Sequence, residues 1–296
     1  MALLNPPELR PSVMLPIVRY LGAQRAQQDM RERLVATLAP VTLKGTGPQR
    51  DVRENLSSAI ELGFIVENGE MVSLADGVLL SVREGPDAVV RLLRTRILAE
   101  DLNSSAWPSQ VGARDLTNAL SWFLTYAPSE SPTKMVDAPR SAQILQNLDF
   151  GPRQGEDDSS NWPIGNATRW STFRRWACSL GFAWVSPSGN LIPDPTVAIR
   201  DVLPDIFESS VELSANDFVD RVGACLPVLD RGRYRQFIIQ NWERPASEFR
   251  GITASLTEAL DRLTIEGAII VDDRHDVERV AKSDGSTFSH VRVGGR

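Results

Sequence analysis

The side chains of this chain best suited to chemistry lie on one predicted helix, which begins near residue 168. Its polar side carries three arginines and three hydroxyl side chains within eight residues: Thr168, Arg169, Ser171, Thr172, Arg174 and Arg175. A guanidinium presents a planar fork that matches a phosphate or a guanine edge, and a short hydroxyl reaches backbone oxygens. We interpret this side as exposed and predict that it contacts nucleic acid. The alternative is a solvated face that pairs with the acidic stretch Glu156, Asp157 and Asp158.

A weaker set of cations surrounds a second predicted helix, which begins near Pro48. Arg50 and Arg53 lie on its outer side, and the acids Asp51 and Glu54 are interleaved with them. Proteins bind DNA non-specifically by neutralising phosphates, so neighbouring acids weaken the attraction. Arg50 and Arg53 are therefore candidate DNA contacts on a less favourable surface.

The cations of the C-terminal third are even less suited to DNA. A cluster around Tyr234 consists of Arg231, Arg233 and Arg235. The hairpin predicted further along the chain carries four acids that would repel phosphate: Asp272, Asp273, Asp276 and Glu278. For this surface we expect contact with protein.

Residues that could support catalysis or hold a metal are few. The two histidines, His275 and His290, fall in the last hairpin, where they could face each other, but such histidines are usually ordinary surface residues. Cys178 and Cys225 lack the CxxC spacing of a zinc site, and no GxxxxGK[ST] or GxGxxG motif occurs. We expect no cofactor, no metal site and no catalytic activity in the isolated chain.

The elements that must position these side chains follow a pattern that occurs three times. In each copy an amphipathic helix ends at a glycine, and a short apolar strand and a polar hairpin follow; the glycines are Gly63, Gly181 and Gly267. Glycine ends a helix readily because it adopts the left-handed conformation at low cost. The pattern resembles the third helix and wing of a winged-helix domain.

These repeats predict a mainly α protein with short β-hairpins (α+β), built from three tandem winged-helix domains. We place the domains at residues 10–100, 101–207 and 208–296 and expect a loop insertion at 151–160 in the second. A helix expected over residues 87–100 could tie the first domain to the next.

The overall charge limits how the chain could bind DNA. Its 296 residues carry a net charge of −6, and residues 201–296 hold 12 basic and 17 acidic side chains, a net of −5. Any DNA contact must therefore come from local patches. No apolar stretch is long enough to cross a bilayer and no secretory signal is evident, so we expect a cytoplasmic protein without a membrane partner.

Two features of the sequence carry a resemblance to known proteins. The helix–Leu-Gly-Phe–hairpin units look like winged-helix domains of bacterial regulators and defence-system accessory proteins. The opening Leu3-Leu4-Asn5-Pro6, followed by Pro11-Ser12-Val13-Met14-Leu15, more narrowly resembles an accessory protein of the bacterial clusters that install 7-deazapurines in DNA. The resemblance implies a non-catalytic partner in a DNA-modification or antiviral defence system and brings no catalytic residues.

The residues leave several functions open. In the first interpretation, the helix that begins near residue 168 in the middle domain binds duplex DNA, and the other domains bind further subunits of a defence complex. In the second, all the winged helices bind protein and the chain is an assembly or scaffold subunit. A transcriptional regulator and an enzyme are further alternatives, although no dimerisation helix and no acid–base constellation is evident.

Overall fold

The computed structural model describes residues 2–5, 10–43, 47–104, 112–156, 159–243 and 251–295. Within these ranges helices dominate, and the strands form four small antiparallel sheets. The prediction of a mainly α protein with short β elements is therefore confirmed. None of the helices described is long and apolar enough to cross a membrane.

The first module is a group of three helices closed by a small sheet. In chain order its elements are α1 (Pro11–Ala23), β1 (Gln28–Met30), α2 (Arg31–Leu38), α3 (Pro48–Glu61), β2 (Ile65–Asn68) and β3 (Met71–Leu74). The last strand lies between the other two, so the sheet order is β1-β3-β2. Helix α3 buries Val52 and Leu56, and the chain turns into β2 at Gly63, whose φ of 77° favours glycine.

The third module repeats this order of elements with additions. It comprises α9 (Thr196–Phe207), β6 (Glu212–Ser214), α10 (Ala215–Cys225), α11 (Arg233–Gln240), α12 (Ala254–Ile265), β7 (Ile269–Asp272), β8 (Val280–Ala281), β9 (Thr287–Phe288) and β10 (His290–Val293). Its sheet order, β6-β10-β7, again places the last strand in the middle. Helix α9 falls in the stretch that our domain boundaries assign to the second domain, and it packs against α10 and α12. Helix α11 and the β8–β9 pair have no counterpart in the first module.

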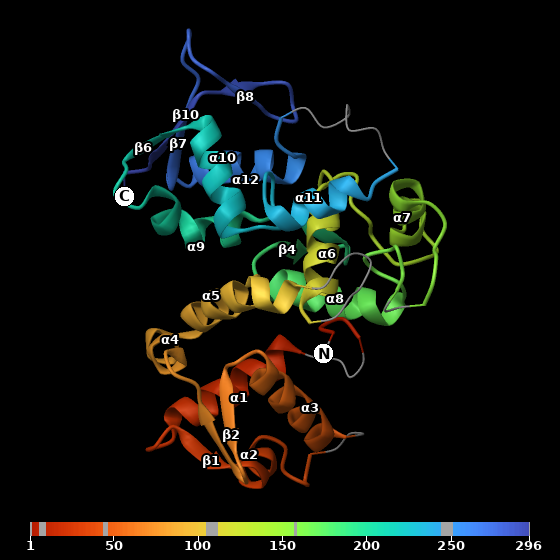
Figure 1. Ribbon diagram of the computed structural model, residues 1–296, viewed down its shortest axis with the longest axis vertical. Helices are drawn as coiled ribbons and strands as arrows, with labels where there is room; N and C mark the ends of the chain where they lie inside the picture. The colour runs from red at the N-terminus through yellow and green to blue at the C-terminus, as the bar shows by residue number, and fades with distance from the viewer. Residues whose placement is uncertain are drawn as a thin grey trace.

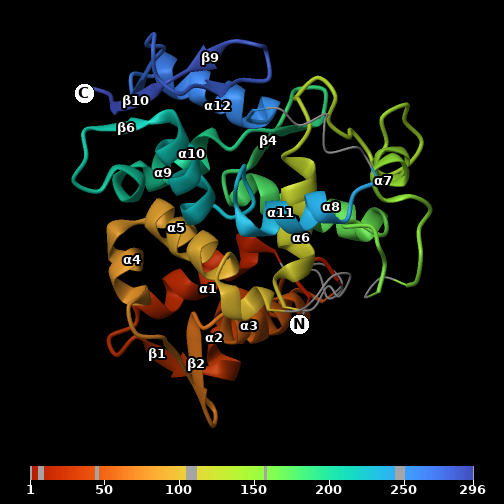
Figure 2. The same cartoon turned by 45° about the horizontal axis from the view of Figure 1, so that its top comes forward.

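The middle module, like the first, has three α-helices, but its sheet is smaller. After the short 3-10 helix η1 (Glu100–Asn103) it contains α6 (Arg114–Phe123), α7 (Ala142–Phe150), α8 (Ala167–Ser179), β4 (Ala183–Val185) and β5 (Leu191–Pro193). In the described ranges β4 and β5 pair only with each other. Every residue of α6 is buried, so this helix forms the centre of the molecule. In Figures 1 and 2, α6 lies next to α8 and to α11 of the third module.

The first module is joined to the others through α4 (Val78–Glu84) and α5 (Pro86–Ile97), as Figure 1 shows. Arg94 of α5 is only 2% exposed. Its Nε donates to the Leu180 carbonyl at the end of α8 (2.7 Å), and its Nη2 pairs with Asp201 of α9 (2.9 Å). A buried guanidinium is tolerated when its donors are satisfied in this way. The expectation that this helix ties the first module to the next is confirmed.

Candidate nucleic-acid interface

Helix α8 does not present its six predicted site residues on one open face. Arg169 and Thr172 are buried, so the expectation that these two face solvent is wrong. Arg169 is covered because α6 packs on that side of α8, and the Thr172 hydroxyl donates to the Thr168 carbonyl one turn earlier (3.1 Å). The residues that remain exposed or partly exposed are Thr168, Ser171, Arg174 and Arg175.

Arg169 takes part in a buried ion pair instead. Its Nη2 lies 3.7 Å from Oδ2 of Asp115 on α6, and both side chains are 0% exposed. Asp115 also accepts hydrogen bonds from the backbone amides of Leu3 (3.1 Å) and Leu4 (2.6 Å). Burial raises the pKa of Asp115 to about 6, although Arg169 and the amides favour its charged form. Arg169 therefore holds α8 against α6, and Asp115 fixes the N-terminal segment in the core.

The open residues of α8 line a pocket of about 470 Å³ against the start of α1. The residues around it are Pro11, Ser12, Ser171, Arg174, Arg175, Cys178, Ser179 and Val185, and none of them is acidic. No side chain caps the start of α1. Pro11 has no amide hydrogen, and the amides of Val13 and Met14 donate to the Arg10 carbonyl, so this wall offers an anion the amide and hydroxyl of Ser12.

The two arginines of this pocket are held differently. Nη2 of Arg174 donates to the Gly189 carbonyl in the β4–β5 turn (2.9 Å), which fixes the guanidinium against the hairpin. Arg175 lies at the exposed end of the pocket lining. Burial raises the pKa of the Cys178 thiol, so this sulfur stays protonated and is a poor nucleophile. The arrangement suits electrostatic binding of a phosphate rather than covalent chemistry.

The predicted DNA contacts of α3 are exposed but neutralised. Nε of Arg50 lies 2.7 Å from a carboxylate oxygen of Glu54, one turn along the same helix. Arg53 pairs with Glu32 of α2. A phosphate that approached this face would have to displace these carboxylates, which lowers its gain in electrostatic energy.

Most cations of the third module are also paired. Arg233 lies 2.7 Å from Glu100, Arg231 lies 3.1 Å from Asp220, and Arg274 contacts Glu212 at 2.5 Å. Arg235 is buried, and burial lowers its pKa to about 10. The described part of this surface therefore offers few unpaired cations to a nucleic acid.

The two histidines do not face each other. His290 of β10 stands opposite Asp272 of β7, and Nδ1 of His275 lies 3.0 Å from a guanidinium nitrogen of Arg279. Across the ranges that the structure describes, no group of three His, Cys, Asp or Glu side chains could hold a metal ion.

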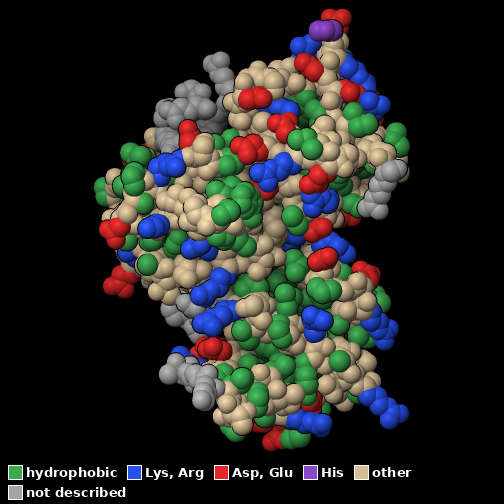
Figure 3. All heavy atoms as spheres, turned by 180° about the vertical axis from the view of Figure 1, so that it is seen from behind, with side chains coloured by type: hydrophobic (Ala, Val, Ile, Leu, Met, Phe, Trp, Pro, Cys, Tyr) green, Lys and Arg blue, Asp and Glu red, His purple; other side chains and the backbone are tan. Residues whose placement is uncertain are grey.

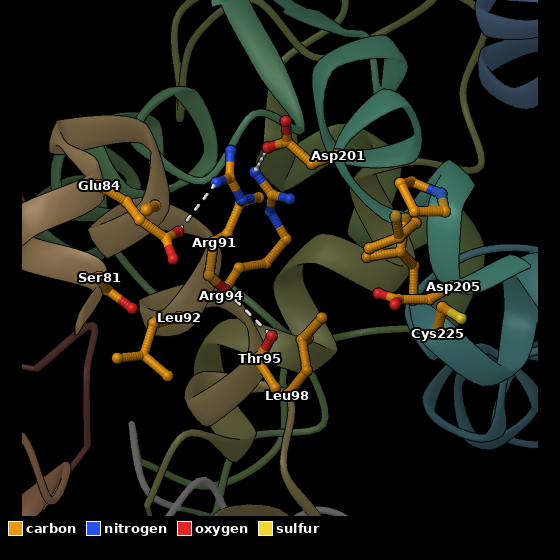
Figure 4. A pocket seen from close by; sticks show the side chains of 14 residues that line it. Ser81, Glu84, Arg91, Leu92, Arg94, Thr95, Leu98, Asp201, Asp205 and Cys225 are labelled. Atoms are coloured by element: carbon orange, nitrogen blue, oxygen red, sulfur yellow. Dashed lines mark hydrogen bonds and ion pairs between the residues drawn. The ribbon is translucent and has the colours of Figure 1, made fainter. Parts of the chain in front are cut away.

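A second pocket, of about 360 Å³, lies between the first and third modules. In Figure 4, Glu84, Arg91 and Arg94 come from the α4–α5 side, and Asp201, Asp205 and Cys225 come from the opposite side. Seen from behind in Figure 3, the surface is hollowed between the upper and lower halves, and acidic and basic side chains are mixed around it. Carboxylates on both walls make this pocket unsuited to a polyanion.

Sequence reasoning missed two parts of the candidate interface. The start of α1 lies far from α8 in the chain, and only the fold brings Ser12 into the pocket. The pairing of Asp115 with Arg169 was missed because both residues occupy polar positions of predicted helices. A proline at the first position of α1 signals a helix start, but it does not indicate what the start faces.

In the part of the chain that the structure describes, the modules and this pocket define a mainly helical, multi-module protein with a small basic recess between α1 and α8. A model of the DpdG-like family matches residues 1–277, and the chain therefore belongs to that family. This membership confirms the resemblance to an accessory protein of a 7-deazapurine DNA-modification system. Neither the comparison with curated proteins nor the comparison with solved structures gives a match.

Proposed function

We propose that this chain is a non-catalytic subunit that binds DNA and partner proteins in a bacterial DNA-modification and defence system. Family membership supports the system, and the pocket between α1 and α8 supports the DNA contact. The observation that carries the proposal is the composition of that pocket: Arg174, Arg175, three serines and a helix start, with no acid among its lining residues.

We also propose that the first and third modules are winged-helix units. The order helix, strand, two further helices and two strands, with the last strand central in the sheet, supports this assignment for both. On this interpretation α9 is the first helix of the third unit rather than the end of the second. The middle module is then a reduced version whose hairpin has two strands.

The pocket favours contact with the phosphate backbone over readout of bases. A recognition helix is about 10–12 Å across with its side chains, and the major groove of DNA is about 12 Å wide. Helix α8 packs beside α1, so the pair is too broad to enter the groove together. We therefore expect binding that depends strongly on salt and weakly on sequence.

Fluorescence anisotropy across a salt series tests this proposal. We expect the double variant R174A/R175A to bind a labelled duplex about 100-fold more weakly than the wild type, with a salt slope smaller by about 2. The matched control is R50A/R53A, which also removes two arginines, but from carboxylate-paired positions. Equal losses in both variants would indicate a general charge effect and would contradict a site at α8.

A purely protein-binding assembly subunit is the second candidate. The observation that favours it is the outer face of α7, where Ile144 is 45% exposed and Leu148 is 60% exposed one turn apart. Exposed apolar pairs on a helix often mark a protein contact. If wild type binds no duplex even at low salt, this candidate replaces the DNA-binding proposal.

A further inference from the structure

The strands that follow α3, α8 and α12 share an exposed apolar residue at their second position. This residue is Val66 of β2 (44% exposed), Trp184 of β4 (40%) and Ile270 of β7 (39%). The first residue of each strand is buried. Because side chains alternate along a strand, the three exposed residues lie on the outer faces of their sheets. They occupy equivalent places in the three modules and can be compared directly.

The middle module pairs this position with a second apolar side chain. Trp184 stands opposite Ile192 of β5, which is partly exposed. In the other two modules the opposite residue is polar, a serine on β3 and an arginine on β10. Residues directly opposite each other in an antiparallel pair lie close enough for their side chains to contact. The outer face of the β4–β5 hairpin therefore carries an apolar pair that includes an aromatic ring, whereas the corresponding pairs of the other modules are half polar.

Trp184 is also the most exposed tryptophan in the part of the chain that the structure describes. Trp242 is partly buried, and four others are at most 6% exposed: Trp122, Trp162, Trp170 and Trp176. Tryptophan is enriched at contacts with partners because its ring contributes a large apolar area. An exposed tryptophan in a chain that otherwise buries this residue type indicates a contact site.

The residue after Trp184 places this face next to the basic pocket. Val185 lines the pocket between α1 and α8 together with Arg174 and Arg175, and none of the described lining residues is acidic. The bond from Arg174 to the Gly189 carbonyl holds its guanidinium against the same hairpin. In the described ranges β4 pairs with β5 alone, so the other edge of β4 is unpaired. A ligand that lies over this edge reaches the arginines on one side and Trp184 on the other.

We propose that the outer face of the β4–β5 hairpin binds an unpaired base of a nucleic-acid strand whose phosphates lie at Arg174 and Arg175. This base site deepens the DNA contact proposed above and depends on it. Proteins that bind single strands combine cations along the backbone with aromatic rings on which the bases stack. A base inside a duplex is already stacked and paired, so it does not offer its face to Trp184. The site therefore favours a single-stranded or gapped segment over a fully paired duplex.

The variant Trp184→Ala tests this proposal, because it removes an exposed ring without opening the core. For a labelled thymidine oligonucleotide of about ten nucleotides we expect binding about tenfold weaker than that of the wild type, with an unchanged salt slope. Binding of a blunt duplex should not change. Trp184→Phe keeps an aromatic ring and should retain most of the affinity. The matched control is Val66→Ala, which truncates the equivalent position of the first module and should bind like the wild type.

An abasic oligonucleotide of the same length gives a second test, which requires no variant. It keeps the phosphates and removes the bases, so the wild type should bind it about tenfold more weakly than the thymidine oligonucleotide. Trp184→Ala should bind the two oligonucleotides equally. If the wild type also binds them equally, no base stacks on the protein and the proposal is wrong.

The outcomes separate the base site from the DNA contact on which it depends. If R174A/R175A weakens binding of the thymidine oligonucleotide and Trp184→Ala does not, the phosphate contact stands and the base site is wrong. If neither variant changes the binding, both proposals are contradicted. A melting temperature clearly lower for Trp184→Ala than for Val66→Ala would show that the ring stabilises the fold, and a structural role of this kind would overturn the base site.

Discussion

Helices α3 and α8 occupy corresponding places in their modules, and both carry arginines predicted to contact DNA, yet the fold treats these arginines differently. On α3, Arg50 and Arg53 reach solvent beside the carboxylates of Glu54 and Glu32. On α8, Arg169 is buried against Asp115, and Arg174 and Arg175 line a recess without acids. The same residue type thus pairs with a carboxylate at the surface, pairs with one in the core, or lines a pocket whose described lining residues include no acid.

This difference shows which property a binding surface requires. The number of arginines on a helix does not predict affinity for a polyanion, because the carboxylate of an ion pair offsets much of the positive potential of its arginine. What matters is whether a carboxylate stands within reach, and that depends on elements distant in the chain. The following predictions test one class of arginine at a time, through the arginine itself or through the acid that pairs with it.

The buried class should give the largest change in stability. Arg169→Met leaves Asp115 in the core without its ion pair, which costs about 3–5 kcal/mol in the free energy of unfolding. Urea denaturation measures this loss. Arg175→Met, an exposed position on the same helix, should leave the unfolding midpoint almost unchanged. Equal effects of the two substitutions would remove the distinction between a core arginine and an open one.

The partner of Arg169 should give a smaller effect that depends on pH. Burial raises the pKa of Asp115 from 3.8 to about 6, so the folded chain binds this proton more tightly than the unfolded chain does. The stability from this group is complete below pH 4 and is lost as the pH rises through 6, by about 3 kcal/mol.

Asp115→Asn isolates this term, because asparagine does not titrate. The difference in free energy of unfolding between wild type and Asp115→Asn should therefore change across the interval from pH 4 to pH 7. A difference that stays constant over that interval would contradict a raised pKa.

The sequence predicted local features of the fold better than the site. The glycines predicted to end α3, α8 and α12 do adopt positive φ. Ser141 and Ser214 cap α7 and α10, a role for which serine is well suited. These features depend on neighbours a few residues away. The burial of Arg169 depends on Leu3, Leu4 and Asp115, which come from distant parts of the chain.

This dependence on distant residues also explains why only the α8 side of the pocket could be predicted from the sequence. Helical spacing places Ser171, Arg174 and Arg175 on a polar side of α8, and the structure leaves them accessible. Helical spacing, however, contains no information about which element packs opposite these residues. The start of α1 completes the pocket, and the Gly189 carbonyl orients Arg174, because tertiary packing brings them there.

The smallest expected effect concerns α3, whose arginines are exposed but paired. If Glu32 and Glu54 prevent this face from binding phosphate, the double variant E32Q/E54Q should remove the ion pairs of Arg50 and Arg53 while keeping the shape of the side chains. Two positive charges without partners would then attract phosphate, and we expect duplex affinity at low salt to rise about threefold. The matched control D276N/E278Q removes two exposed acids of the third module and makes the same change in net charge, so it should leave the affinity unchanged if the effect is local to α3. An affinity that does not rise would mean that the geometry of α3, and not its carboxylates, keeps this helix from DNA.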